Sequence, residues 1–159
     1  MNPKPEKDPR SASPSPSPAK GDGQHILIVE DNAGDVLLFH RAIKAANLTA
    51  EIHVVRDGEQ AVLFFDKLDG EPSSVCPSLV ILDINLPKKH GYDVLRHIRA
   101  SLRCRETPVI VVSTSDSNRD RQTMEALGAN RYFNKPSDLA EFMMIGDIVH
   151  DLLAPPQAV

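Results

Sequence analysis

The chain has 159 residues, of which 41% are hydrophobic and 25% charged, so it is long and apolar enough to form one globular domain. Its net charge of −4 argues against direct nucleic-acid binding through bulk positive charge. No apolar run reaches the roughly 18 residues of a membrane span, and the N-terminus lacks the apolar centre of a signal peptide. We therefore expect a cytoplasmic protein without membrane insertion.

Residues 1–23 differ in composition from the rest of the chain. They hold six of the 13 prolines and no aliphatic residue beyond Met1 and alanines. Such a segment buries too little apolar surface to offset the entropy of ordering, so we predict a disordered Pro- and Ser-rich tail. We expect one folded domain over 24–153 and a short C-terminal tail over 154–159.

From residue 25 onward, short apolar runs that predict strands alternate with apolar residues at the spacing of amphipathic helices. In chain order, we predict a strand at 25–29, a helix with Val36, Phe39, Ile43 and Ala46 on one face, a strand at 51–55, a helix with Ala61, Phe64, Phe65 and Leu68, and a strand at 78–82. We then predict a helix after Gly91 with Leu95, Ile98 and Leu102, a strand at 109–113, a polar helix at 117–127, a strand at 131–134 and a helix with Phe142, Ile145, Val149 and Leu152.

Five strands that alternate with five helices predict an α/β fold with a mostly parallel sheet covered on both faces. We expect a doubly wound (βα)5 arrangement in three layers. In such sheets, functional sites form beyond the carboxyl ends of the strands, where the strand order reverses. A sheet of order 2-1-3-4-5 would make the first and third strands neighbours.

Polar side chains follow four of the five predicted strands. Glu30 and Asp31 follow the first strand, Asp83 follows the third, Ser113 ends the fourth and Lys135 follows the fifth. The three carboxylates would repel one another unless a cation compensated their charge. Mg²⁺, which prefers oxygen ligands, and the lysine ammonium would both do so. This set of residues indicates phosphoryl transfer with an aspartate as the nucleophile.

Simpler interpretations exist for the same residues. Glu30 and Asp31 could cap the first helix, because anions are favourable at a helix N-terminus. Lys135 could be a solvated loop lysine. Thr114, rather than Ser113, could supply the functional hydroxyl.

The cysteines and histidines show no ligand spacing. Cys76 and Cys104 are far apart in sequence and match no zinc or redox motif, so we interpret them as free thiols of a reducing compartment. None of the six histidines is assigned a role.

Four segments together resemble the receiver domain of two-component response regulators. They are "IVED" at 28–31, "LDINLPKKHG" at 82–91, "PVIVVSTS" at 108–115 and "RYFNKP" at 131–136. Their order and spacing match over nearly all of residues 25–153. The resemblance implies a flavodoxin-like sandwich whose parallel sheet has the order 2-1-3-4-5.

The resemblance also implies a role for each matching residue. Asp83 would accept a phosphoryl group from a histidine kinase with Mg²⁺ as cofactor. Asp31 would bind the metal directly, Glu30 through water, Asp83 through its carboxylate and Asn85 through its backbone carbonyl. Ser113 would be the switch hydroxyl that contacts the phosphoryl group. Lys135 would pair with the same group.

Three further expectations concern the surroundings of these residues. Tyr132 matches the aromatic position that changes rotamer when Ser113 moves, although static core packing would give the same pattern. Pro136 would follow a cis peptide bond. Gly91 would supply a backbone angle that other residues resist.

The longer loop at 66–78, the "LPKKHG" segment and the absence of an output domain resemble small response regulators that pair with phytochrome-type histidine kinases. This subfamily implies a stand-alone receiver that signals to a downstream protein target or phosphotransfer protein. A homodimer through the face of the fourth helix, fifth strand and fifth helix fits the same pattern. The protein would not be an enzyme beyond self-catalysed phosphoryl acceptance and autodephosphorylation, in which Ser115 and Asn85 would flank the attacking water.

Two other function classes agree less well with these residues. A Mg²⁺-dependent phosphatase on a related sheet generally carries Asp-x-Asp after the first strand, but Ala33 stands where the second aspartate would be. A receiver that binds partners without phosphate would have lost its acceptor or its lysine, but Asp83 and Lys135 are both present.

Overall fold

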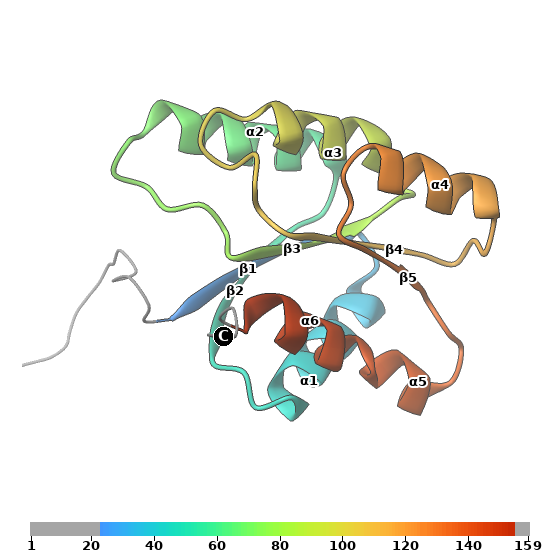
Figure 1. Ribbon diagram of the computed structural model, residues 1–159. Helices are drawn as coiled ribbons and strands as arrows, with labels where there is room; N and C mark the ends of the chain where they lie inside the picture. Colours follow the sequence, from blue (N-terminus) through green and yellow to red (C-terminus); the bar gives the residue numbers. More distant parts are fainter. Residues whose placement is uncertain (1–22, 155–159) are drawn as a thin grey trace, which may run out of the picture.

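A five-stranded parallel sheet of order β2-β1-β3-β4-β5 forms the central layer of the computed structural model (Figure 1). The strand order confirms the prediction, and it makes β1 and β3 neighbours. The strands are β1 (Gln24–Val29), β2 (Ala50–Val55), β3 (Leu79–Asp83), β4 (Val109–Ser113) and β5 (Arg131–Asn134).

The structure describes residues 23–154. Nearly all of the two predicted tails, 1–22 and 155–159, lies outside these residues. Within the described part of the chain, no helix has the length and apolar character needed to cross a membrane.

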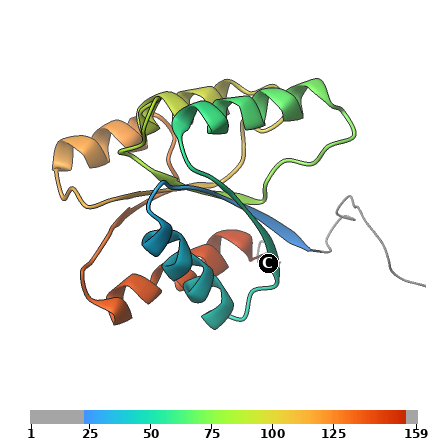
Figure 2. The same cartoon turned by 180° about the vertical axis from the view of Figure 1, so that it is seen from behind.

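Helices cover both faces of the sheet and complete the three predicted layers (Figures 1 and 2). One face carries α2 (Gly58–Gly70), α3 (Gly91–Ala100) and α4 (Asn118–Ala126). The other carries α1 (Ala33–Ala45), α5 (Leu139–Met143) and α6 (Ile145–Leu153). The predicted flavodoxin-like α/β fold is therefore confirmed.

The last predicted helix is divided into α5 and α6 at Met144. The Met144 N–H donates to the Glu141 carbonyl, and the Asp147 N–H donates to the Met144 carbonyl. These three-residue spacings are those of a tighter 3₁₀ turn, which separates the two helical segments. Phe142, Ile145 and Val149 are nevertheless all buried, as the predicted stripe requires.

The core consists of two apolar clusters, one on each side of the sheet. Alternate residues of each strand point to opposite faces, so Leu27 and Val29 face the α2 side while Ile26 and Ile28 face the α1 side. All residues of β3 and β4 are buried. Central strands covered on both faces need continuous apolar runs rather than alternation.

Leu102 does not belong to the third helix as predicted. The helix ends at Ala100, with Ser101 as its C-cap, and Leu102 is 76% exposed. The backbone N–H groups of Leu102 and Arg103 instead donate to the carboxylate of Asp69 at the end of α2. These bonds hold the chain in a turn that directs Leu102 outward.

Cys76 and Cys104 form a disulfide bond, so our interpretation of them as free thiols is wrong. The cysteines are 28 positions apart in sequence, but each follows one of the adjacent helices α2 and α3. The packing of those helices brings the two loops together. Sequence spacing alone carries no information about this proximity.

Arg103 also binds the end of α2 and the loop that follows it. Its guanidinium donates to the carbonyls of Leu68, Glu71 and Ser74 and to the Ser74 hydroxyl. The long loop after α2 is thus held by a covalent bond and by a guanidinium that lies among carbonyl groups.

Candidate functional site

The carboxylates predicted to converge do so at the carboxyl ends of β1 and β3. The strand register pairs Val29 with Leu82, so the following residues, Glu30 and Asp83, are neighbours. Glu30 is only 1% exposed and Asp83 5%, whereas Asp31 is exposed. Carboxylate oxygens of Glu30, Asp31 and Asp83 all lie within 4.8 Å of one another.

Lys135 extends from the end of β5 into this cluster. Its Nζ lies 2.9 Å from Glu30 Oε1, 2.8 Å from Asp35 Oδ2 and 3.7 Å from Asp83 Oδ2. Its side chain is only 9% exposed. The alternative of a solvated loop lysine is therefore wrong.

Asp35 is a site residue that the sequence analysis missed. It lies in the first turn of α1, and its carboxylate accepts a hydrogen bond from Lys135. The signal in the sequence is an acidic residue four positions after Asp31, near the start of the predicted helix. The rule that sites form at the ends of strands does not reach Asp35, because this residue lies on a helix.

The first helix is capped by Asn32, and the alternative in which Glu30 and Asp31 cap it is wrong. The Asn32 side chain accepts a hydrogen bond from the Asp35 N–H at 2.9 Å, which is the usual N-cap contact. Glu30 accepts a bond from the Asn32 N–H but otherwise faces Lys135.

The protonation equilibria of the cluster reflect its excess of negative charge. Burial raises the pKa of Glu30 to about 7; the hydrogen bond from Lys135 opposes this rise and the charge of Asp83 adds to it. Burial alone would lower the pKa of Lys135, but its hydrogen bonds to Asp35 and Glu30 outweigh burial and raise it. One lysine thus compensates the carboxylates only in part.

A divalent cation fits this donor set. The groups that converge are carboxylate oxygens, and a buried carboxyl group with a raised pKa gains most from an added positive charge. Hard cations such as Mg²⁺ bind through one or two carboxylates and retain several waters. Glu30, Asp31 and Asp83 are the residues that would hold it.

Ser113 lies at the site's edge of the sheet, at the last position of β4. The register pairs Asp83 with Val112, so Ser113 is one residue further along the neighbouring strand. It is fully buried, and its hydroxyl oxygen accepts a bond from the Ser115 N–H. Thr114 is exposed. This placement favours Ser113 over Thr114 as the hydroxyl available to the site.

The loop after β3 folds back tightly behind Asp83. The Asn85 N–H donates to Asp83 Oδ1 at 3.3 Å, and the Gly91 N–H donates to the Ile84 carbonyl at 2.8 Å. A Cβ at Gly91 would lie 2.7 Å from the Ile84 Cα and 2.8 Å from the Asp83 carbonyl oxygen. Close packing against the acidic strand end therefore requires this glycine.

The expectation that Gly91 adopts an unusual backbone angle is wrong. The residue of this loop with positive φ is Lys88, at 72°. Its ammonium lies 3.9 Å from Asp57 and 3.8 Å from Glu59, at the start of α2.

Tyr132 is half-buried on β5, and its hydroxyl donates to the Ser115 carbonyl at 3.0 Å. The guanidinium of Arg121 lies 4.6 Å from the centre of its ring. Asn134 also donates to the Ser115 carbonyl, at 2.7 Å. The loop that follows Ser113 is therefore bonded directly to β5.

The peptide bond before Pro136 is trans, so the predicted cis bond is wrong. Trans is the lower-energy form of such bonds by about 0.5–1 kcal/mol. Lys135 reaches the carboxylates with this bond trans, while its N–H donates to the Ser113 carbonyl at 2.7 Å.

Comparison with known proteins identifies relatives of the whole folded region. Residues 26–145 match the family described as "Response regulator receiver domain". The response regulator Rcp1 of Synechocystis sp. is 34% identical over 124 residues, which cover 77% of this chain and 84% of Rcp1.

Two solved structures show the same fold at similar identity. The manganese-bound form of Rcp1 has a TM-score of 0.74 at 31% identity, over 84% of this chain and 97% of that one. The phosphorylated cyanobacterial phytochrome response regulator RcpA has a TM-score of 0.73 at 30% identity, over 82% of this chain and 94% of that one.

Proposed function

Because this chain belongs to the response regulator receiver family, we propose that it is a stand-alone response regulator of a two-component phosphorelay, with Asp83 as the phosphoryl acceptor. The observation that carries this proposal is the position of Asp83, which ends a buried strand among Glu30, Asp31 and Lys135. The proposal of a stand-alone protein is supported by Rcp1, most of whose length this chain matches.

The proposed reaction is a phosphoryl transfer from a phosphohistidine of the kinase. A carboxylate oxygen of Asp83 attacks the phosphorus, the bond between phosphorus and the imidazole nitrogen breaks, and that nitrogen retains the electron pair. The product is an acyl phosphate on Asp83. Lys135 and Ser113 donate hydrogen bonds to the phosphoryl oxygens. Such groups stabilise the charge that the phosphoryl oxygens carry in the transition state.

Mg²⁺ is the proposed cofactor, and when bound it would offset negative charge on the carboxylates and phosphoryl oxygens. Asp31 and Asp83 would hold it directly, Glu30 through water, and Asn85 through its backbone carbonyl. The manganese-bound form of Rcp1 supports a divalent cation in a related protein.

We further propose that the phosphoryl group shifts the population between two surface states. Ser113 and Tyr132 would carry the switch. Ser115 links the two residues, because its N–H donates to the Ser113 hydroxyl and its carbonyl accepts a hydrogen bond from the Tyr132 hydroxyl. The signalling surface would be the face of α4, β5 and α5, which would bind a downstream protein target, a phosphotransfer protein or a second copy of the chain. Leu139 and Met144 are both more than half exposed near this face.

The proposed kinase is of the phytochrome type, and the similarity to RcpA, a phytochrome response regulator, supports this proposal. A cytoplasmic location is proposed with this partner, and the Cys76–Cys104 disulfide is unusual for that compartment. The protein would catalyse only its own phosphorylation and autodephosphorylation, with Ser115 and Asn85 beside the attacking water.

The test is incubation with phosphoramidate and Mg²⁺, followed by intact-mass analysis. Wild type should gain one phosphoryl group, and chelation of Mg²⁺ should abolish the gain. Asp83→Asn should gain none, while the matched control Asp93→Asn, an exposed acid on α3, should behave as wild type. Equal labelling of Asp83→Asn and wild type would refute Asp83 as the acceptor.

A further inference from the structure

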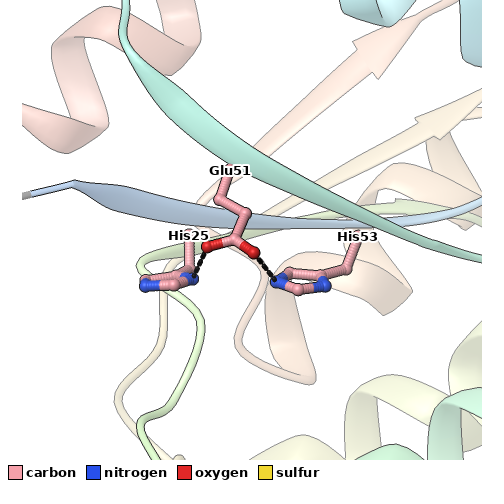
Figure 3. A group of neighbouring side chains, drawn as sticks. All are labelled: His25, Glu51 and His53. Carbon is pink, nitrogen blue, oxygen red and sulfur yellow. Dashed lines mark ion pairs between the residues drawn. The ribbon is translucent and has the colours of Figure 1, made fainter. Parts of the chain in front are cut away.

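Two histidines and a glutamate lie together on β1 and the edge strand β2, away from the acidic cluster. His25 is paired with Glu51 in the parallel register, and His53 is paired with Leu27 two residues further along. Side chains at these alternate positions share one face of the sheet. Figure 3 shows the Glu51 carboxylate between the two imidazole rings.

The separations suit a shared ion better than direct hydrogen bonds. His25 Nδ1 lies 3.6 Å from Glu51 Oε1, and His53 Nε2 lies 3.9 Å from Glu51 Oε2. Both distances exceed the range of about 2.7–3.2 Å for a protein hydrogen bond. One ligand atom from each of the three residues lies within 4.8 Å of the other two. Zinc bonds of about 2.0–2.2 Å place neighbouring ligands of a tetrahedral site roughly 3.4 Å apart.

The backbone holds two of these ligands in a fixed relation. The ladder between β1 and β2 sets the spacing of His25 and Glu51. The loop before β3 fixes His25 further, because the His25 N–H donates to the Ser78 hydroxyl and the Ser78 N–H donates to the His25 carbonyl. The ring of His53 lies 6.4 Å from that of Phe64 on α2. Small movements of the three side chains would bring their ligand atoms to the separations of a tetrahedral zinc site.

We propose that His25, Glu51 and His53 form a binding site for a borderline transition-metal cation, with Zn²⁺ as its representative. Two imidazole nitrogens and a carboxylate oxygen are typical zinc ligands, whereas Mg²⁺ selects oxygen ligands alone. Glu51 is 66% and His53 44% exposed, so a fourth position is open to water or to a ligand from another molecule.

This site is separate from the proposed phosphorylation site. His25 precedes Glu30 by five residues of extended chain, which corresponds to roughly 16 Å. The donor types also differ, so the two sites can be occupied at the same time by different metals. A cation that bridges β1 and β2 would bind the folded state more tightly than the unfolded chain and would raise the stability of the fold by mass action.

The test titrates the metal-free full-length protein with Zn²⁺ by calorimetry, in the presence of saturating Mg²⁺ to occupy the carboxylate cluster. Wild type should bind one Zn²⁺ per chain, and its thermal midpoint should rise. His53→Gln and Glu51→Gln should each weaken binding by about tenfold or more and lose the rise. Co²⁺ used in place of Zn²⁺ should give visible absorption bands in wild type that His53→Gln lacks.

Two variants serve as controls. His150→Gln, which alters an exposed histidine on α6, should bind Zn²⁺ as wild type does. Asp83→Asn should also bind normally, so failure of the phosphorylation proposal would not affect this result. The inference is overturned if His53→Gln binds Zn²⁺ as tightly as wild type, if Asp83→Asn abolishes binding, or if wild type binds none at micromolar concentrations.

Discussion

Lys135 is the residue on which the acidic site depends most. Its side chain is 9% exposed, and its ammonium lies 2.8 Å from Asp35, 2.9 Å from Glu30 and 3.7 Å from Asp83. Its shorter contacts are to Asp35 and Glu30 rather than to Asp83, the proposed acceptor. A phosphoryl group on Asp83 would therefore compete with two existing ion pairs for the same ammonium.

We expect Lys135→Ala to lower the free energy of unfolding by about 3 kcal/mol, because it leaves buried carboxylates without their counter-charge. Added Mg²⁺ should recover part of this loss. Lys44→Ala, at an exposed position in the last turn of α1, should change stability by less than about 0.5 kcal/mol. Urea denaturation with and without Mg²⁺ measures both variants. Equal stability of Lys135→Ala and Lys44→Ala would show that the buried charges are compensated in another way.

Gly91 offers a second test at the scale of one residue. A Cβ there would overlap the backbone of Asp83 and Ile84, whereas a Cβ at Gly70 would meet nothing within 4 Å. We expect Gly91→Ala to destabilise the domain by about 1–3 kcal/mol through overpacking and to reduce phosphorylation of Asp83. Gly70→Ala should be neutral or slightly stabilising. Chemical denaturation of the pair decides whether packing against the strand end requires this glycine.

At the scale of individual elements, the end of α2 is bonded to the chain that follows α3. Asp69 at the end of α2 accepts bonds from the Ser101 hydroxyl and from the N–H groups of Leu102 and Arg103. The bond from Ser101, followed by those from the backbone, lowers the pKa of Asp69, although burial opposes the change. A short stretch of chain is thus fixed by one carboxylate.

This junction predicts a pH dependence of stability. Because the pKa of Asp69 is lower in the folded state, its contribution is complete above its unfolded pKa of about 3.9 and is lost as pH falls through the folded value. Asp69→Asn should therefore lower the thermal midpoint at pH 7, and the difference from wild type should shrink below about pH 4. Asp151→Asn, at an exposed position of α6, is the control for the general loss of a charge. A difference that stayed constant with pH would refute the role of the ionised carboxylate.

The central strands β3 and β4 were predictable because strands buried on both faces leave continuous apolar runs, whereas the strand order followed from the resemblance to receiver domains. The end of α3 and the division of the last helix were not predictable, since backbone bonds at Ser101 and Met144 set them without an apolar signal. Asp35 and the His25–Glu51–His53 group were missed because their proximity depends on strand register and on helix placement. Sequence spacing carries no information about strand register or helix placement.

For the molecule as a whole, the disulfide between Cys76 and Cys104 joins the loops that follow α2 and α3. It closes a segment with a sequence separation of 28 residues. Chain-entropy arguments assign about 3–4 kcal/mol to a loop of this size. The loop enclosed includes all of β3 and α3, and therefore Asp83.

We expect reduction of this disulfide to lower the thermal midpoint by roughly 10 °C or more, because a loss of about 3–4 kcal/mol shifts the midpoint of a domain of this size by about 3–5 °C per kcal/mol. Differential scanning calorimetry with and without dithiothreitol measures the change. Cys76→Ser/Cys104→Ser should reproduce the reduced midpoint and should not respond to the reductant. An unchanged wild-type midpoint after complete reduction, verified by thiol alkylation, would contradict a stabilising role.

We propose that the phosphoryl group forms an acyl phosphate on Asp83, and the decisive experiment maps the modified residue. The phosphorylated chain is reduced with borohydride, which converts an aspartyl phosphate to homoserine, and its peptides are then sequenced by mass spectrometry. We expect homoserine at position 83 and unmodified aspartate at positions 31 and 35. Homoserine at position 31 or 35, or a stable phosphoryl group on a serine or histidine, would contradict it.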